Sequence, residues 1–242
     1  MSTFILVHGS WHGAWCWERI VPMLEQAGHR VIAIDLPAHG KDHTPIAEVN
    51  LKSYTDCLSA VLEQQSEKVI LVGHSMAGVV ISQTAEYFPE KIEKLIYLCA
   101  FLPESGQTLF DAFGIVDLGD DAPTAVYIDE AQTYIGLIDE AIQSHFFADS
   151  SEEVFQYAKA KLVKEPLIPS VTPIQITENK FGSVPRVYIE GLRDRAIPIK
   201  LQRAMYAKMP CEQVITMDTD HSPFYSHTTE LVDNLLQLVL KK

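Results

Sequence analysis

Short, continuous runs of aliphatic and β-branched residues recur along the chain, and each leads into a glycine, a proline or an aspartate. The runs cover residues 4–7, 31–36, 69–72, 95–101, 186–190 and 213–217. Runs without polar alternation are typical of strands covered on both faces, as in a parallel sheet. Between them lie helix-length segments at 16–27, 54–64, 79–88, 201–208 and 229–240. This alternation predicts an α/β fold: a mainly parallel six-stranded sheet flanked by helices, with right-handed crossovers.

Residues 103–182 interrupt this alternation. They contain no strong strand pattern, but residues 129–147 carry apolar side chains at helical spacing, namely Tyr134, Ile135, Ile138 and Ile142. A second helix is predicted to open at Ser150, because Glu153 three residues later completes a capping box. Later prolines end helices and stiffen the returning chain. We therefore predict a helical cap over 103–182, inserted into a core domain formed by 1–102 and 183–242.

Composition limits the partners. The 242 residues include 32 acidic and 19 basic side chains, a net charge of −13, which argues against nucleic acid and anionic lipid as ligands. No apolar stretch approaches the roughly 20 residues of a membrane span. Met1 leads directly into an apolar run without a basic region, so we expect no signal peptide and a cytoplasmic protein. The four cysteines form no C-x-x-C pair, which predicts neither disulfides nor a zinc site.

The stretch 69-VILVGHSMAGVVIS-82 places a serine between a strand pattern and a helix pattern. Small residues at such a corner let the backbone approach itself closely, and a serine there projects its hydroxyl above the carboxyl edge of the sheet. The motif G-x-S-x-G is met at Gly73 and Ser75, with Ala77 in place of the last glycine and Gly78 one residue later. The alternative is a serine that only caps the following helix.

A serine nucleophile needs a base, and the base needs an orienting carboxylate. The loops 190-EGLRDRAIP-198 and 217-MDTDHSPFYS-226 follow the fifth and sixth predicted strands, so both lie on the edge where Ser75 is expected. Asp194 is the predicted acid and His221 the predicted base. The alternatives are that Asp194 pairs with a neighbouring arginine and that His221 caps the last helix.

Acyl transfer also needs backbone N–H groups aimed at the developing oxyanion, each contributing about 3 kcal/mol. Met76, directly after the serine, is predicted to supply one, and Ser10, in the loop 8-HGSWHGAW-15, the second. His8 and His12 have the i, i+4 spacing of some metal ligands. However, the loop is rich in glycine and lacks a helical pattern, so we predict no metal there or at His39 and His43.

The pieces 4-FILVHGSWHGAWCWERIVPMLEQAGHRVIAIDLPAHG-40, 69-VILVGHSMAG-78, 188-YIEGLRDRAIP-198 and 220-DHSPF-224 resemble the α/β-hydrolase superfamily. More narrowly, they resemble the small esterases of the plant methylesterase and hydroxynitrile lyase group. They cover both ends of the chain, whereas the cap matches nothing specific. The resemblance implies a cofactor-free serine hydrolase with Ser75, Asp194 and His221 as its triad. It also implies an oxyanion hole from the backbones of Ser10 and Met76.

Two positions depart from the lyase branch of this group, which typically has a threonine in the first loop and a lysine after the catalytic histidine. Here these positions are Gly9 and Ser222. Without that cation a leaving cyanide is poorly stabilised, so we favour ester hydrolysis through an acyl-enzyme. The alternatives are a hydroxynitrile lyase, a thioesterase or a carbon–carbon hydrolase on the same scaffold, a ligand receptor with negligible turnover, and an interaction protein.

The expected ligand is a small-molecule ester, neutral and apolar or aromatic. The predicted cap carries fourteen acidic residues against four lysines, which favours neutral or cationic substrates over anionic ones. We predict a substrate pocket walled by Trp11, Phe110, Phe113, Tyr134, Phe146 and Phe147. The alternative is that these side chains belong to the core of the cap. Monomer and homodimer both remain open, as does the identity of the ester.

Overall fold

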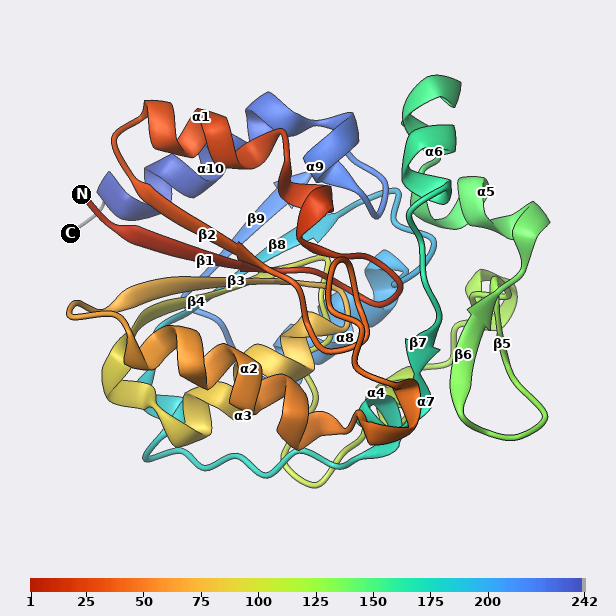
Figure 1. The fold of residues 1–242 in the computed structure, drawn as a ribbon, viewed down its shortest axis with the longest axis horizontal. Coiled ribbons are helices and arrows are strands. Elements are labelled where there is room, and N and C mark those ends of the chain that lie inside the picture. The colour runs from red at the N-terminus through yellow and green to blue at the C-terminus, as the bar shows by residue number, and fades with distance from the viewer. Residues whose placement is uncertain (241–242) are drawn as a thin grey trace.

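The computed structural model describes residues 1–240, and a six-stranded parallel sheet forms its centre (Figure 1). The strand order is β2-β1-β3-β4-β8-β9, and each neighbouring pair is parallel. The strands are β1 (Thr3–Val7), β2 (Arg30–Ile34), β3 (Val69–His74), β4 (Ile92–Leu98), β8 (Arg186–Gly191) and β9 (Gln213–Met217). The predicted fold class and the six core strands are confirmed.

Helices cover both faces of this sheet (Figure 1). One face carries α1 (Ile20–Gln26) and α10 (Thr228–Leu240), and the other carries α2 (Leu51–Glu63), α3 (Ala77–Tyr87) and α8 (Ile199–Lys208). Two cores result, because successive side chains of a strand point to opposite faces. In β1, Phe4 and Leu6 enter the core beneath α1 and α10, whereas Ile5 and Val7 enter the core of α2, α3 and α8.

The flanking helices differ from their predicted limits for local reasons. The expected helix over 16–27 divides into a 3-10 turn, η1 (Ala14–Trp17), and the helix α1. Pro22 fits the first turn of α1, where a backbone N–H has no helical partner. The second helix begins at Leu51 instead of Tyr54, because Asn50 and Ser53 form a reciprocal capping box.

The chain leaves the main sheet after β4 and returns at β8. Most of the intervening segment lies beyond the carboxyl ends of the strands, and its last part runs back past α3 to the start of β8 (Figure 1). It is not purely helical, since an antiparallel sheet of order β5-β6-β7 forms part of it. Its elements are α4 (Leu109–Phe113), β5 (Val126–Ile128), β6 (Tyr134–Leu137), α5 (Ile142–Phe146), α6 (Glu152–Lys159), β7 (Glu165–Pro166) and α7 (Leu167–Val171). The remaining short elements of the chain are η2 (Ile46–Glu48), η3 (Pro89–Lys91), η4 (Gly119–Asp121), η5 (Asp139–Ala141), η6 (Phe181–Ser183) and α9 (Pro223–Ser226).

The helix predicted over 129–147 is wrong. The Asp129 carboxylate accepts hydrogen bonds from the amides of Thr133 and Tyr134 at 2.6 and 2.7 Å, which fixes a hairpin turn instead of a helix start. Gln132 in this turn has a positive φ of 54°. The next helix begins one residue later than predicted: Ser151, not Ser150, caps α6, because the Ser150 amide still bonds the Phe147 carbonyl of the preceding turn.

None of the helices within residues 1–240 has the length and apolar character needed to cross a membrane.

The turn between β3 and α3 is tightly bonded to the end of β4. Ser75 has a left-handed φ of 55°, which is unusual for a residue with a side chain. Its amide donates to the Leu98 carbonyl at 3.2 Å, and its carbonyl accepts from the Phe101 amide at 3.0 Å. A Cβ on Gly78 would lie 2.0 Å from the Phe101 carbonyl oxygen. The turn therefore requires glycine at 78, while the methyl group of Ala77 is accommodated in the core.

We predict that Gly78→Ala lowers the free energy of unfolding by about 1–3 kcal/mol, because the added methyl group forces the Phe101 backbone to move. Urea denaturation of the purified variant measures this change. Gly114→Ala is the matched control, because the nearest atom to its new Cβ is 3.4 Å away and its φ of −79° suits alanine. Equal stabilities of the two variants would contradict the close packing at Gly78.

Candidate active site

The three side chains predicted to act together all follow the carboxyl ends of core strands. Ser75 follows β3, Asp194 follows β8, and His221 follows β9. Each residue is buried, with at most 6% of its surface exposed. The parallel arrangement places these three strand ends at one edge of the sheet, as the sequence predicted.

Asp194 and His221 form a buried pair. The Nδ1–H of His221 donates to Asp194 Oδ2 at 2.8 Å. Gln202 Nε2 donates to the same oxygen at 3.1 Å, and the amides of Ala196 and Ile197 both donate to Oδ1 at 2.8 Å. Four donors thus hold the carboxylate in place. Because the carboxylate fixes Nδ1 as the protonated nitrogen of a neutral ring, Nε2 keeps its lone pair for use as a base.

His74 connects the serine turn to the His221 loop. Its Nε2–H donates to the His221 carbonyl at 2.8 Å, and the two rings lie 4.6 Å apart between centroids. Burial, followed by the proximity of His221, holds the pKa of His74 well below its ordinary value, so the ring is neutral. This bond ties the His221 loop to the residue that directly precedes Ser75. Within residues 1–240, however, no hydrogen bond joins the Ser75 hydroxyl to the His221 ring.

The loop after β1 lies directly against the serine. A Cβ on Gly9 would be 2.7 Å from Ser75 Cβ, so only glycine permits this approach. Among the described residues, the amides of Ser10 and Met76 donate no hydrogen bond, which leaves both N–H groups for a ligand. His12 Nδ1–H donates to the Ser10 carbonyl at 2.7 Å, and burial lowers the pKa of His12 to about 4. A neutral histidine therefore holds this loop.

Trp11 attaches the same loop to the inserted segment. Its amide donates to Glu165 Oε2 at 3.1 Å, its indole Nε1–H donates to the Ile135 carbonyl at 2.9 Å, and its own carbonyl accepts from the Val163 amide at 2.9 Å. Glu165 also accepts from His39 Nε2 and from the Tyr54 hydroxyl, each at 2.9 Å. The role of Glu165 could not be predicted from the sequence, because nothing in its local pattern distinguishes a buried carboxylate from an exposed one.

Three of the four histidines considered as metal ligands, His8, His12 and His39, have other partners, and His43 is exposed. His8 Nδ1–H donates to the Gly9 carbonyl at 2.8 Å, and His8 Nε2 accepts from the Leu36 amide at 3.0 Å. His39 bonds Glu165. Within residues 1–240, no group of three or more histidine, cysteine, aspartate or glutamate side chains is arranged to hold a metal ion.

A cavity opens at Ser75, and its empty space, including the part open to solvent, is about 540 Å³. Fifteen residues line it: twelve are apolar or aromatic, and the other three are Ser10, Ser75 and Ser170. Four of the predicted wall residues take part, namely Trp11, Phe110, Phe113 and Phe146. Ala196, Ile197 and Phe101 contribute from the core domain, and no charged side chain within residues 1–240 lines the space.

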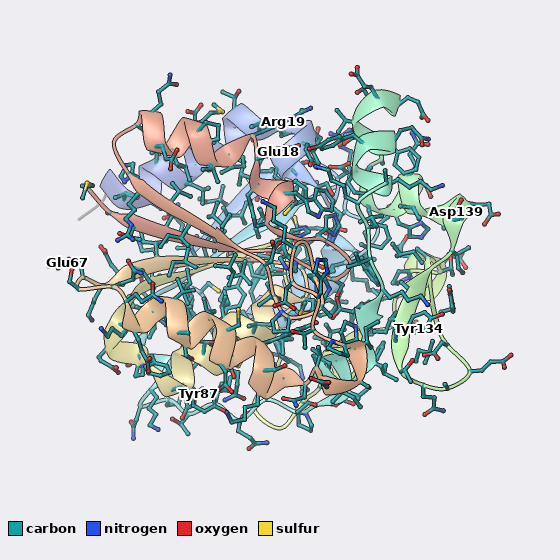
Figure 2. The ribbon with its side chains drawn as sticks, viewed as in Figure 1. Glu18, Arg19, Glu67, Tyr87, Tyr134 and Asp139 are labelled. Carbon is teal, nitrogen blue, oxygen red and sulfur yellow. The ribbon has the colours of Figure 1, made fainter. Side chains whose placement is uncertain are left out.

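Two predicted wall residues lie elsewhere. Tyr134 lies on the small sheet (Figure 2) and is absent from the cavity lining, and Lys164 Nζ lies 4.0 Å from the centre of its ring. Tyr134 is the first residue of β6, and successive side chains of a strand point to opposite faces. The neighbouring Ile135 therefore lines the cavity instead of Tyr134. Phe147 is fully buried and packs against His12 and Phe155 in the core.

Comparisons with known proteins identify relatives in sequence and in overall structure. Methylesterase 7 of Arabidopsis thaliana is 34% identical over 255 residues, which cover 98% of this chain and 96% of that protein. Putative methylesterase 11, chloroplastic, from the same plant is 35% identical over 246 residues, covering 97% of this chain, but this chain spans only 63% of that protein. The crystal structure of polyneuridine aldehyde esterase has a TM-score of 0.88 at 26% identity and 99% coverage of both chains.

The family model described as "Alpha/beta hydrolase family" matches residues 4–234, nearly the whole chain. The match extends through the serine turn, the inserted segment and the loops that carry Asp194 and His221. The predicted resemblance to plant methylesterases is confirmed, and this chain belongs to the alpha/beta hydrolase family.

Proposed function

We propose that the protein is a cofactor-free serine esterase that cleaves small neutral carboxylic esters through an acyl-enzyme. The observation that carries this proposal is the buried Asp194–His221 pair, 2.8 Å long, beside the Ser75 turn at the mouth of an apolar cavity. The names of the relatives support the same reaction, since they include methylesterases and polyneuridine aldehyde esterase.

In the proposed first step, His221 Nε2 takes the proton of Ser75, and the serine oxygen attacks the ester carbonyl. The Ser10 and Met76 amides, which have no partner among the described residues, stabilise the oxyanion. The alcohol leaves with the proton from His221. Because no hydrogen bond joins the Ser75 hydroxyl to the His221 ring in the described structure, the proton transfer requires one of the two groups to move. Hydrogen bonds of this kind often tighten only when substrate binds.

In the second step, His221 activates a water molecule that releases the acid. Asp194 keeps the imidazole in the tautomer with Nδ1–H and stabilises its charged form. Gln202 and the two loop amides donate hydrogen bonds to Asp194, which keep its carboxylate oriented within a buried site.

The cavity supports ester hydrolysis over lyase chemistry. The residue after His221 is Ser222, which is fully buried, and no lysine or arginine of the described chain lines the cavity. A leaving cyanide would therefore lack a stabilising cation. The apolar lining favours neutral acyl groups, because a second carboxylate would be buried without a partner.

The proposal also includes a cytoplasmic location and a small-molecule partner. The four cysteines are free, which fits a reducing compartment such as the cytoplasm. The net charge of −13 disfavours nucleic acid and anionic membranes, and a small-molecule ester is the proposed partner.

Ser75→Ala is expected to remove hydrolysis of p-nitrophenyl acetate, by a factor of about 10⁴ or more, while leaving the melting temperature within a few degrees. The change deletes the proposed nucleophile but little packing. Ser183→Ala, a change at an exposed position away from the cavity, serves as the control with full activity. Unchanged turnover in the Ser75 variant would refute the assignment.

We predict that acid lowers the free energy of unfolding through the protonation of His12. Its folded pKa of about 4 lies below the unfolded value of 6.5, so between these pH values only the unfolded chain binds the proton. The contribution of His12 to stability is complete above pH 6.5, and roughly 3 kcal/mol of it is lost on acidification to pH 4. Urea denaturation at pH 7.5 and pH 4 measures the fall in the free energy of unfolding. In the His12→Gln variant this fall should be smaller by roughly 3 kcal/mol than in the wild type. His43→Gln, at an exposed site, is the control, and an identical acid loss in both variants would contradict the role of His12.

A further inference from the structure

Ser170 is the one polar residue of the described cavity lining that has no part in the proposed chemistry. Of the three lining serines, Ser75 supplies the nucleophile and Ser10 an oxyanion amide. Ser170 lies on α7, in the inserted segment, and is 1% exposed. Its hydroxyl makes no hydrogen bond to any described residue, and no other lining residue has a buried polar side-chain atom without a partner.

A buried hydroxyl without a partner is costly. Leaving such a group unsatisfied opposes folding, whereas alanine at the same position would fill nearly the same space without that cost. Helical serines usually bond a carbonyl of the preceding turn, but Ser170 does not. The Ser170 hydroxyl belongs to the lining of a ligand cavity, so a bound ligand can complete its hydrogen bonding and remove this cost.

We propose that Ser170 is a specificity-determining residue that hydrogen-bonds a neutral oxygen function of the substrate. This inference rests on the proposed esterase function and adds the class of ester. The lining holds no charged side chain among the described residues, which argues against a carboxylate or a phosphate as the partner of Ser170. A hydroxyl, ketone or ether oxygen suits it, because serine both donates and accepts. The substrate is thus an ester with an apolar or aromatic body and one neutral oxygen function away from the scissile carbonyl.

Matched pairs of methyl esters test this inference: benzoate, phenylacetate and 3-phenylpropanoate, each with a para hydroxyl or a para methyl group of similar size. At one chain length, the wild-type protein should prefer the hydroxyl ester by about tenfold in kcat/KM. Ser170→Ala should remove that preference and leave hydrolysis of the methyl-substituted partner within about threefold. Val171→Ala is the control on the same helix, since Val171 is 40% exposed and lies outside the cavity lining.

Stability supplies an independent reading of the same variant. Ser170→Ala should melt at the wild-type temperature or above it, because no bond within the protein is lost. A clear fall in melting temperature would show that the hydroxyl has a structural partner, and would overturn the inference. An unchanged hydroxyl-to-methyl ratio at every chain length would overturn it as well. Failure of the wild-type protein to hydrolyse any of the six esters would instead count against the proposed function.

Glu165 is a separate feature, because it acts on the oxyanion loop instead of the cavity. It is fully buried and accepts three hydrogen bonds: from the Trp11 amide, from His39 and from the Tyr54 hydroxyl. Burial lowers the pKa of His39, but the Glu165 carboxylate more than offsets this and raises it above the ordinary value. Glu165 thus favours the protonated form of His39, with which it makes a buried 2.9 Å contact at the junction of the inserted segment and the core domain.

We infer that Glu165 is a positioning residue that aims the Ser10 amide at the oxyanion. Trp11, the next residue, has a left-handed φ of 63°, a conformation that a tryptophan adopts only when its surroundings impose it. The bond from Glu165 to the Trp11 amide supplies one such restraint, at 3.1 Å. The peptide that carries the Trp11 N–H also carries the Ser10 carbonyl, so fixing this peptide restricts the rotation of the preceding one.

Glu165→Gln should lower kcat for p-nitrophenyl acetate by about ten- to hundredfold with KM changed less than threefold, because only the oxyanion contact is disturbed. The affinity for a trifluoromethyl ketone, which forms an oxyanion on the serine, should weaken by the same factor. Glu140→Gln, at an exposed site of the inserted segment, is the matched control. Unchanged kcat and unchanged inhibitor affinity in the folded variant would overturn the inference.

Tyr54→Phe provides a milder test should the first variant fold poorly. It removes one bond to Glu165 Oε1 and leaves the Trp11 and His39 bonds in place. We expect the affinity for the trifluoromethyl ketone to weaken less than in Glu165→Gln, again with KM nearly unchanged. A variant that loses thermal stability but binds this inhibitor as the wild type does would show a purely structural role and exclude positioning.

Discussion

The left-handed turn at Ser75 is the constraint on which the rest of the site depends. A side-chain-bearing residue at a φ of 55° is held there only because its amide and carbonyl are both bonded to the end of the neighbouring strand β4 (Ile92–Leu98). Those bonds require the Phe101 backbone to pass within contact distance of Gly78. The serine is therefore fixed by the sheet itself, and the other groups are arranged around it by loops from adjacent strand ends.

The core domain alone supplies an incomplete site. It provides the serine, the Asp194–His221 pair and the two free amides, but most of the apolar wall comes from the inserted segment. That segment also contributes Glu165, whose buried charge is tolerable only because His39 and Tyr54 of the core domain complete its hydrogen bonding. The proposed recognition of substrate and the proposed alignment of the oxyanion loop thus depend on the same insertion.

The features predictable from sequence were those that repeat locally or sit at strand ends. Continuous apolar runs identified all six core strands, and Asp194 and His221 were found because parallel strands bring their carboxyl ends to one edge. The helix predicted through Tyr134 and Ile135 failed because spacing alone cannot reveal that Asp129 closes a turn with its side chain. The partners of Glu165 and the isolation of Ser170 were out of reach for another reason. The partners of Glu165 are distant from it in the sequence. The isolation of Ser170 is the absence of a hydrogen-bond partner, which only the folded structure reveals.

The absence of a cation from the described cavity lining bears on turnover as well as on selection. A neutral ester enters by burying apolar surface, which stabilises it throughout the cavity. In the proposed reaction, the acid product carries a full charge in a cavity whose described lining holds no charged side chain. Desolvation of this charge weakens the binding of the product relative to the substrate. The lining that is proposed to favour a neutral ester would therefore also favour release of its acid.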